Sequence, residues 1–244
     1  MMKSYQSMKY WLLNLLAINS MFRHFFLMKY ILNFFAGILL TGCCTISIEK
    51  ASDQSTSNNS SKLLFDGKTF KGWEGNMEFF RIRDQAIVAG RLTEKIPNNE
   101  FLCTTSEFEN FDLQLKFKVV GSSEANAGIQ FRTKRIPNHH EVIGFQADIG
   151  QKYWGALYDE SRRRKILAAP PSEDIPKIAN LDGWNSYRIL AKGDHIQLFL
   201  NGHKTVDYIE KDLNIEKKGV IALQVHSGPA CEIHYKDIHI IEYP

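Results

Sequence analysis

The stretch FDLQLKFKV, residues 111–119, decides the fold class. Its apolar residues occupy every odd position from Phe111 to Val119, and every even position is polar. Because successive side chains of a β-strand point to opposite faces, this pattern predicts a strand with one face in a core and the other toward water. Such a strand requires a partner sheet to cover its apolar face.

The same alternation recurs through the second half of the chain. It predicts further strands at residues 128–132, 144–149, 184–191, 196–200, 220–226 and 232–241. Gly193-Asp194 and Asn201-Gly202 mark hairpin turns between neighbouring strands. Residues 92–107 and 172–181 show a non-strand or briefly helical pattern. Many short strands at this spacing predict an all-β sandwich of two antiparallel sheets.

Residues 1–42 are predicted to be a leader segment. A charged Met28-Lys29 precedes the apolar residues 30–40, and Leu40-Thr41-Gly42-Cys43 resembles a bacterial lipobox. The resemblance implies cleavage before Cys43 and lipidation of its thiol, hence an exported lipoprotein in the periplasm or at the outer membrane. A single transmembrane anchor is the alternative, because the apolar run is long enough to span a bilayer.

Composition divides the rest of the chain into two parts. Residues 43–62 are polar and lack aromatic side chains, which predicts a flexible tether. Residues 63–244, about 180 in number, suffice for one domain with a substantial core. Removing the leader takes four of the 30 Lys and Arg residues and none of the 27 Asp and Glu, leaving a net charge of −1. A nearly neutral domain argues against a nucleic-acid partner.

Two cysteines fall inside the predicted domain, Cys103 and Cys231. An exported protein could join them in a disulfide, but their separation in sequence does not determine whether they meet. Cys103 follows Phe101-Leu102, which favours a small buried apolar role for it. The pairing of the two thiols therefore stays open at this stage.

Polar side chains share one face of three predicted strands. Alternation directs the apolar residues inward and leaves Gln130, Arg132, Gln146, Asp148, Gln224 and His226 on the other face. Open faces of antiparallel sheets are polar in any case, so a solvated surface is the alternative. However, these amide, carboxylate, guanidinium and imidazole groups are directional hydrogen-bonding types. We therefore expect a site for a polyhydroxylated ligand such as a sugar.

A set of short motifs occurs along the predicted domain in a fixed order. They are LFDGK (64–68), GW (72–73), LTEK (92–95), NEF (99–101), NAGIQFR (126–132), GFQAD (144–148), WG (154–155), LYDESR (157–162), WN (184–185) and LNG (200–202). Together they resemble the 3-keto-disaccharide hydrolase domain family over residues 63–243. The resemblance implies a concanavalin-like jelly-roll fold. It also implies cleavage of glycosides whose sugar has been oxidised to a ketone at C3.

The implied reaction assigns roles to the polar residues. A base removes the proton at C2, a cation or donor stabilises the enolate, and the glycosidic oxygen leaves by β-elimination before water adds. His226, Asp148 and Glu160 are the candidate base and acid. Arg132 and Arg162 are candidates for orienting the sugar or stabilising negative charge. The sequence contains no tight metal-ligand motif and identifies no cofactor with certainty, but a divalent metal could take over the arginine role, with carboxylates and His226 as suitable ligands.

Further substrate-binding candidates complete the expected site. Trp154 and Tyr158 would form a wall for sugar stacking, with Gly155 leaving room for close approach. Strand parity places Glu160 and Arg162 on one side and Asp159, Arg163 and Lys165 on the other. The full set of binding candidates is Arg132, Gln130, Gln146, Arg162, Trp154, Tyr158, Gln224 and Glu94. A carbohydrate-binding module or lectin-like surface protein of the same fold is the competing hypothesis.

Overall fold

A computed structural model describes residues 60–244. The predicted leader, the lipidation candidate Cys43 and all but the last three residues of the predicted tether lie outside the described residues. Within the described part, no helix is both long and apolar enough to cross a membrane.

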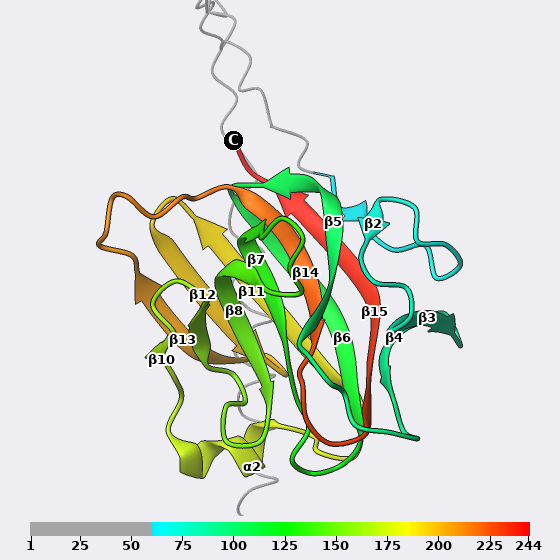
Figure 1. Cartoon of the computed structure of the whole chain (residues 1–244). Helices are drawn as coiled ribbons and strands as arrows, with labels where there is room; N and C mark the ends of the chain where they lie inside the picture. Colours follow the sequence, from blue (N-terminus) through cyan, green and yellow to red (C-terminus); the bar gives the residue numbers. More distant parts are fainter. Residues whose placement is uncertain (1–59) are drawn as a thin grey trace, which may run out of the picture. The chain divides into compact units, whose positions relative to one another are not determined.

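The described chain folds into two antiparallel sheets packed face to face. The first has the order β13-β12-β11-β6-β15-β4-β3, with β1 also pairing with β15, and the second has the order β10-β9-β8-β7-β14-β5-β2. Figure 1 shows β7, β8 and β14 of the second sheet lying over β6, β11 and β15 of the first. The predicted all-β jelly-roll sandwich is confirmed.

Short antiparallel strands account for nearly all regular structure in residues 60–244. The first sheet contains β1 (Lys62–Leu63), β3 (Phe80–Arg83), β4 (Ala86–Arg91), β6 (Phe111–Gly121), β11 (Asn185–Lys192), β12 (His195–Leu200), β13 (His203–Ile209) and β15 (Cys231–Glu242). The second contains β2 (Trp73–Glu74), β5 (Glu100–Phe108), β7 (Asn126–Arg135), β8 (Val142–Gly150), β9 (Leu157–Glu160), β10 (Lys165–Ala168) and β14 (Gly219–Val225). A 3-10 turn (Ser172–Asp174) and α2 (Ile175–Ile178) occupy the segment predicted to be non-strand.

The core lies between the two sheets, as the alternation predicted. In β6 the odd residues from Phe111 to Phe117 are buried in the main apolar cluster, and Gln114 and Lys116 are exposed. The Phe117 ring contacts Trp154 from the second sheet's side and Tyr187 from β11, at centroid distances of 5.8 and 5.7 Å. Burial of such aromatic side chains supplies much of the free energy that holds a sandwich together.

Strand β5 contradicts the prediction that residues 92–107 are non-strand. Its first five residues are all buried, so it shows no alternation in sequence. Leu102 joins the main core, whereas Phe101 and Cys103 on the opposite face form a second apolar cluster with Val142 and Ala222. Because β5 is covered on both sides, period two gives no signal there.

The two cysteines of the domain lie in different layers. Cys103 belongs to the small cluster on the outer face of the second sheet, whereas Cys231 lies in the core between the sheets. Both thiols are free, and burial raises the pKa of each to about 11. The structure therefore supports the buried apolar role expected for Cys103 and does not join the two residues.

Candidate functional site

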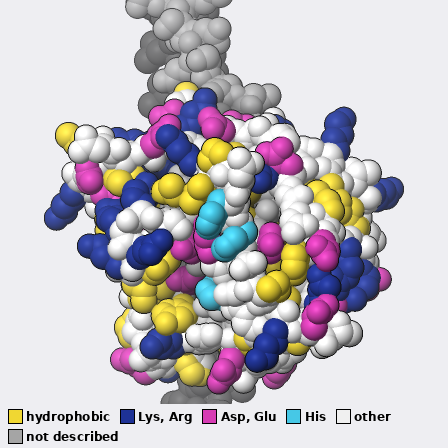
Figure 2. Space-filling view, in the orientation of Figure 1, with side chains coloured by type: hydrophobic (Ala, Val, Ile, Leu, Met, Phe, Trp, Pro, Cys, Tyr) yellow, Lys and Arg dark blue, Asp and Glu magenta, His cyan; other side chains and the backbone are white. Residues whose placement is uncertain are grey.

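A cavity of about 390 Å³ opens on the outer face of the second sheet. Its volume falls within the range of small-ligand sites. In Figure 2, His side chains gather near the centre of the face in view, with Asp and Glu side chains beside them. We call this cavity the first pocket. It is lined by Asn99, Asn126, Gln146, Asp148, Tyr153, Tyr158, Glu160, Arg164, Lys165, Ile166 and His226.

All three candidate catalytic residues line the first pocket, and they come from different strands. Asp148 is on β8, Glu160 ends β9, and His226 directly follows β14. Glu160 pairs with Gly144 of β8, four positions from Asp148, so the backbones of the two residues stand about 13 Å apart along the strand direction. Both side chains nevertheless line the same pocket, where the charge of Glu160 raises the pKa of Asp148.

Gln146 and Tyr158 occupy the floor between the two acidic residues, where they form a cross-strand pair. Gln146 Nε2 donates to Asp148 Oδ1 at 2.5 Å, and Gln146 Oε1 accepts from Gln130 Nε2 at 2.5 Å. The Gln146 side chain lies across Gly128 of β7, where an added Cβ would come within 2.4 Å of Gln146 Cδ. Glycine at 128 thus makes space for the amide that orients Asp148.

Asp148 is a strongly perturbed acid. Its side chain is buried at the base of the pocket, and this desolvation raises its pKa from 3.8 to about 8. The hydrogen bond from Gln146 lowers the pKa, and the nearby Glu160 raises it. Because burial disfavours the charged form, Asp148 is mostly protonated at neutral pH and can donate a proton.

Glu160 is perturbed less, to a pKa of about 7. Burial is the main cause, and the charge of Glu141 raises the pKa further. A backbone hydrogen bond from Ser161 and the charge of Arg164 lower it. At neutral pH a substantial fraction of Glu160 is therefore ionised and able to accept a proton, while Asp148 holds one. Two carboxyl groups with separated pKa values are an arrangement that enzymes use for acid and base catalysis.

Hydrogen bonding fixes the tautomer and position of His226. Its Nδ1 lies 2.6 Å from the carbonyl oxygen of Ser227, which can only accept, so Nδ1 carries the proton. In the neutral ring, Nε2 is then left with a free lone pair. The Ser227 amide donates to Asn99 Oδ1 at 2.9 Å, and Asn99 Nδ2 donates to Glu141 at 2.9 Å. This chain of bonds holds the imidazole at the pocket wall.

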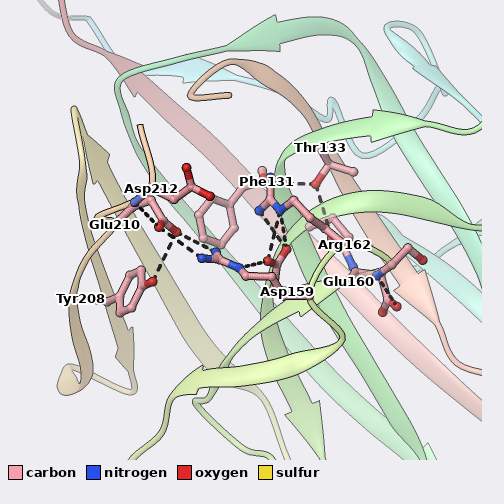
Figure 3. Close-up of polar contacts among 11 residues, drawn as sticks. Phe131, Thr133, Asp159, Glu160, Arg162, Tyr208, Glu210 and Asp212 are labelled. Atoms are coloured by element: carbon pink, nitrogen blue, oxygen red, sulfur yellow. Dashed lines mark hydrogen bonds and ion pairs between the residues drawn. The ribbon is translucent and has the colours of Figure 1, made fainter. Parts of the chain in front are cut away.

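A buried ion-pair cluster shapes the turn between β9 and β10. Asp159 is fully buried and accepts from both Arg162 and Arg163, and Arg163 also pairs with the buried Glu210. Figure 3 shows Asp159, Arg162 and Glu210 joined by these contacts, with Tyr208 bonded to Glu210. Because buried charges require such partners, the cluster fixes the turn that carries the pocket residues Arg164 and Lys165.

The cluster corrects the predicted division of this segment. Arg162 binds Asp159 and stacks its guanidinium over Phe145 at 4.7 Å, outside the first pocket. Lys165, expected on the opposite side from Glu160, lines the pocket with it. Parity fails here because the chain leaves strand geometry at Ser161, which has a φ of 55°. The cations of the first pocket are therefore Arg164 and Lys165.

Arg132 also lies outside the first pocket. A β-bulge shifts the register of β7 between Phe131 and Lys134, and Arg132 adopts a φ of 49°. Its guanidinium donates to the carbonyl oxygens of Glu109 and Gly193 and so ties together two turns. A bulge reverses the facing of the residues that follow it, which is why alternation placed Arg132 incorrectly.

Two further binding candidates, Trp154 and Glu94, do not line the first pocket and have structural contacts elsewhere. Trp154 packs on Phe117 in the core, and the preceding Tyr153 lines the pocket in its place. Gly155, expected to leave room for a sugar, instead leaves room for Thr205, whose Cγ2 would lie 2.8 Å from an added Cβ. Glu94 is exposed and pairs with Arg91 at 2.6 Å.

Gln130 and Gln224 lie on the predicted face but beneath other residues. Both are fully buried. Val142, the first residue of β8, forms an apolar cluster with Phe101 and Ala222 on this face of the sheet. Gln130 donates to Gln146 and so helps to position the amide that contacts Asp148. The Gln224 amide has no hydrogen-bond partner among the described residues.

Sequence reasoning missed several pocket residues, and some of them could have been found. Asn99 and Asn126 lie within the motifs that carried the family resemblance, and Tyr153 stands next to the aromatic residue that was chosen. Arg164 and Lys165 belong to a basic run, residues 162–165, that reads equally well as a charged loop face, and only the three-dimensional course of the turn after Glu160 brings them to the pocket. In residues 60–244, no group of three or more His, Cys, Asp or Glu side chains is placed to hold a metal ion.

Comparisons with known proteins agree with this fold. The sequence model of the 3-keto-alpha-glucoside-1,2-lyase-like domain matches residues 60–241. A search of curated proteins gave no match.

Two candidate glycosyl hydrolases of Parabacteroides distasonis have similar solved structures. The first is 17% identical with a TM-score of 0.58 over 76% of this chain and 95% of its own, and the second is 23% identical with a TM-score of 0.57 over 76% and 100%. The carbohydrate-binding module CBM66 from Bacillus subtilis is 12% identical, with a TM-score of 0.53 over 70% and 96%. At these identities the solved structures establish the shared fold only.

Proposed function

Because the chain belongs to the 3-keto-alpha-glucoside-1,2-lyase-like domain family, which supports a carbohydrate-related function, we propose that it cleaves glycosides whose sugar carries a ketone at C3. The observation that carries the proposal is the first pocket itself. There a protonated Asp148, a partly ionised Glu160 and an imidazole with a free Nε2 stand around one cavity of sugar-binding size. A simple binding module does not require titratable groups tuned in this way.

The proposed reaction begins at C2 of the oxidised ring. A base takes the proton from C2, and the electrons of that C–H bond form an enolate on the C3 oxygen. As the carbonyl at C3 forms again, a C1=C2 double bond appears and the bond from C1 to the glycosidic oxygen breaks. A proton reaches the departing oxygen, which leaves as an alcohol. Addition of water across C1=C2 then gives the free 3-keto sugar, so the net change is hydrolysis.

The pocket offers a residue for each proton transfer and each charge. Glu160 is the proposed base, because its pKa of about 7 leaves it ionised in part at neutral pH while still basic. Asp148 is the proposed acid for the glycosidic oxygen. Arg164 and Lys165, next to Glu160 in the pocket lining, would stabilise the enolate oxygen. His226 Nε2 would bind a sugar hydroxyl or serve as the second base.

The proposal is tested with 3-keto-trehalose and the purified domain. The wild type should release glucose, and Glu160→Gln and Asp148→Asn should each lower kcat by about 10²-fold or more, since each removes a proton-transfer group. Retention of sugar binding by both variants would show that the pocket is intact. Binding by the wild type without any release of glucose would contradict the enzyme and support a carbohydrate-binding module instead.

We also propose that the protein is exported and tethered to a membrane by a lipid on Cys43, with residues 43–62 as the tether. The motif Leu40-Thr41-Gly42-Cys43 supports this proposal. Mass spectrometry of the protein purified from its membrane fraction should show a diacylglyceryl group on an N-terminal Cys43. A soluble Cys43→Ala protein would agree with the anchor, and an uncleaved leader in the wild type would contradict it.

A further inference from the structure

A second cavity of about 370 Å³ lies beside the first pocket on the same face of the sheet. We call it the second pocket. It is lined by Glu74, Gly75, Asn76, Glu100, Phe101, Arg135, His139, His140, Glu141 and Val142. These residues come from the end of β2 and the segment after it, from the start of β5, and from the chain between the end of β7 and the start of β8. The proposed reaction uses none of them directly.

The two pockets are adjacent, and the hydrogen-bonded pair Asn99–Glu141 separates them. Asn99 lines the first pocket, and the next residue in the chain, Glu100, lines the second. The Asn99 side chain donates to Glu141 of the second pocket at 2.9 Å. Glu141 is close enough to Glu160 for its charge to raise the Glu160 pKa. A ligand that fills the first pocket therefore has the second within reach across the Asn99–Glu141 pair.

The side chains of the second pocket suit a neutral polyhydroxylated group. Carboxyl oxygens of Glu100 and Glu141 can accept from hydroxyls, and no described residue donates to the buried Glu141 Oε2. A buried acceptor without a partner is unfavourable, so a hydroxyl donor there would be favoured. The rings of His139 and His140 stack on each other at a centroid distance of 4.5 Å, and both residues line the pocket.

Charge in the second pocket narrows the choice of ligand. Three carboxyl groups, on Glu74, Glu100 and Glu141, face one guanidinium, that of Arg135, which is already paired with Glu74 at 3.0 Å. An anionic group such as a phosphate or a uronate would meet repulsion there. A neutral sugar unit would not, because its hydroxyls can donate to the carboxyl oxygens.

We propose that the second pocket is the subsite for the leaving group, and that it selects a neutral sugar unit over an anionic one. This inference rests on the proposed function, because it places the oxidised ring in the first pocket. A disaccharide would then cross the Asn99–Glu141 pair, with its glycosidic bond above that pair. A glycoside with a methyl leaving group would fill the first pocket alone.

The test compares 3-keto-trehalose with methyl 3-keto-α-glucoside. The double variant Asn76→Ala, His140→Ala removes two exposed side chains of the second pocket and is expected to fold normally. We expect the ratio of kcat/KM for the disaccharide to that for the methyl glycoside to fall about tenfold, which corresponds to about 1.4 kcal/mol of lost binding. His203→Ala, an exposed change in the other sheet, should leave the ratio unchanged.

Calorimetry separates failure of the subsite from failure of the proposed function. The wild type should bind 3-keto-trehalose more tightly than the methyl glycoside, and the double variant should bind both with similar Kd. Unchanged ratios in both the kinetics and the Kd values would overturn the subsite even if the wild type is active. If the wild type cleaves neither compound, the proposed function fails. The ratio of the Kd for 3-keto-trehalose to that for the methyl glycoside, compared between the wild type and the double variant, then decides whether the second pocket binds a sugar unit.

Discussion

Replacing Asp148 by Asn should change how the stability of the domain depends on pH. Asn has nearly the same shape, and its Oδ1 can still accept from Gln146, so packing is preserved. It has no proton to lose, however. In the wild type the pKa of Asp148 is about 8 in the folded state, because burial disfavours the carboxylate, whereas an unfolded aspartate titrates near 3.9.

The sign and size of the effect follow from this difference. The raised pKa of Asp148 contributes stability that is fully present below pH about 4 and is lost as the pH rises toward 8. In that window the folded state holds one more proton than the unfolded state, so the free energy of unfolding falls by up to about 1.4 kcal/mol per pH unit. Between pH 5 and pH 7 the upper value is about 3 kcal/mol. Water in the pocket screens the charge, so we expect about 1–3 kcal/mol.

Urea unfolding measured from pH 5 to pH 8 isolates this contribution. The free energy of unfolding of the wild type minus that of Asp148→Asn should decline across the range, since titrating groups that do not interact with Asp148 cancel in the difference. Asp182→Asn, at an exposed position, is the matched control and should give a flat difference. A flat difference for Asp148→Asn as well would refute the protonated, buried carboxyl group on which the proposed acid depends.

Three further changes test the surroundings of the catalytic groups. Gly128→Ala should displace Gln146, lower the free energy of unfolding by about 1–3 kcal/mol and reduce turnover, as measured by urea unfolding and steady-state kinetics. Glu141→Gln keeps an acceptor for the Asn99 amide but removes the negative charge that raises the pKa of Glu160. The acid limb of the pH–rate profile, assigned to Glu160, should therefore move to lower pH. An unmoved limb would contradict that assignment. Asp159→Asn should destabilise the domain by about 3 kcal/mol because it leaves two arginines short of a partner, and an unchanged urea midpoint would contradict the structural role of the cluster.

Alternation in sequence was sufficient for the sandwich and for part of the site. It predicted β6 and β8, and with β8 the facing of Gln146 and Asp148 into the pocket. It worked because these strands are regular and have one face in the core. Strand β5 escaped notice because Phe101 and Cys103 are covered on the face that alternation assigns to water.

The errors in the predicted site occur where the chain departs from regular strand geometry. The bulge at Arg132 and the left-handed residue at Ser161 each change which way the following side chains point. Trp154 follows the end of β8, where no periodicity applies, and its apolar ring enters the core. Arg164 and Lys165 reach the pocket only through the fold of a turn held by buried ion pairs. Such contacts between distant residues leave no periodic trace in the sequence.

The central claim is that cleavage begins with removal of the proton at C2 of a 3-keto sugar. Incubating the wild-type domain with 3-keto-trehalose in D₂O, and following the products by NMR, tests it most directly. The account predicts release of glucose together with a 3-keto sugar that carries deuterium at C2, and no release from trehalose itself. Release from trehalose at a similar rate, or a 3-keto product without deuterium at C2 beyond that in an enzyme-free control, would contradict it.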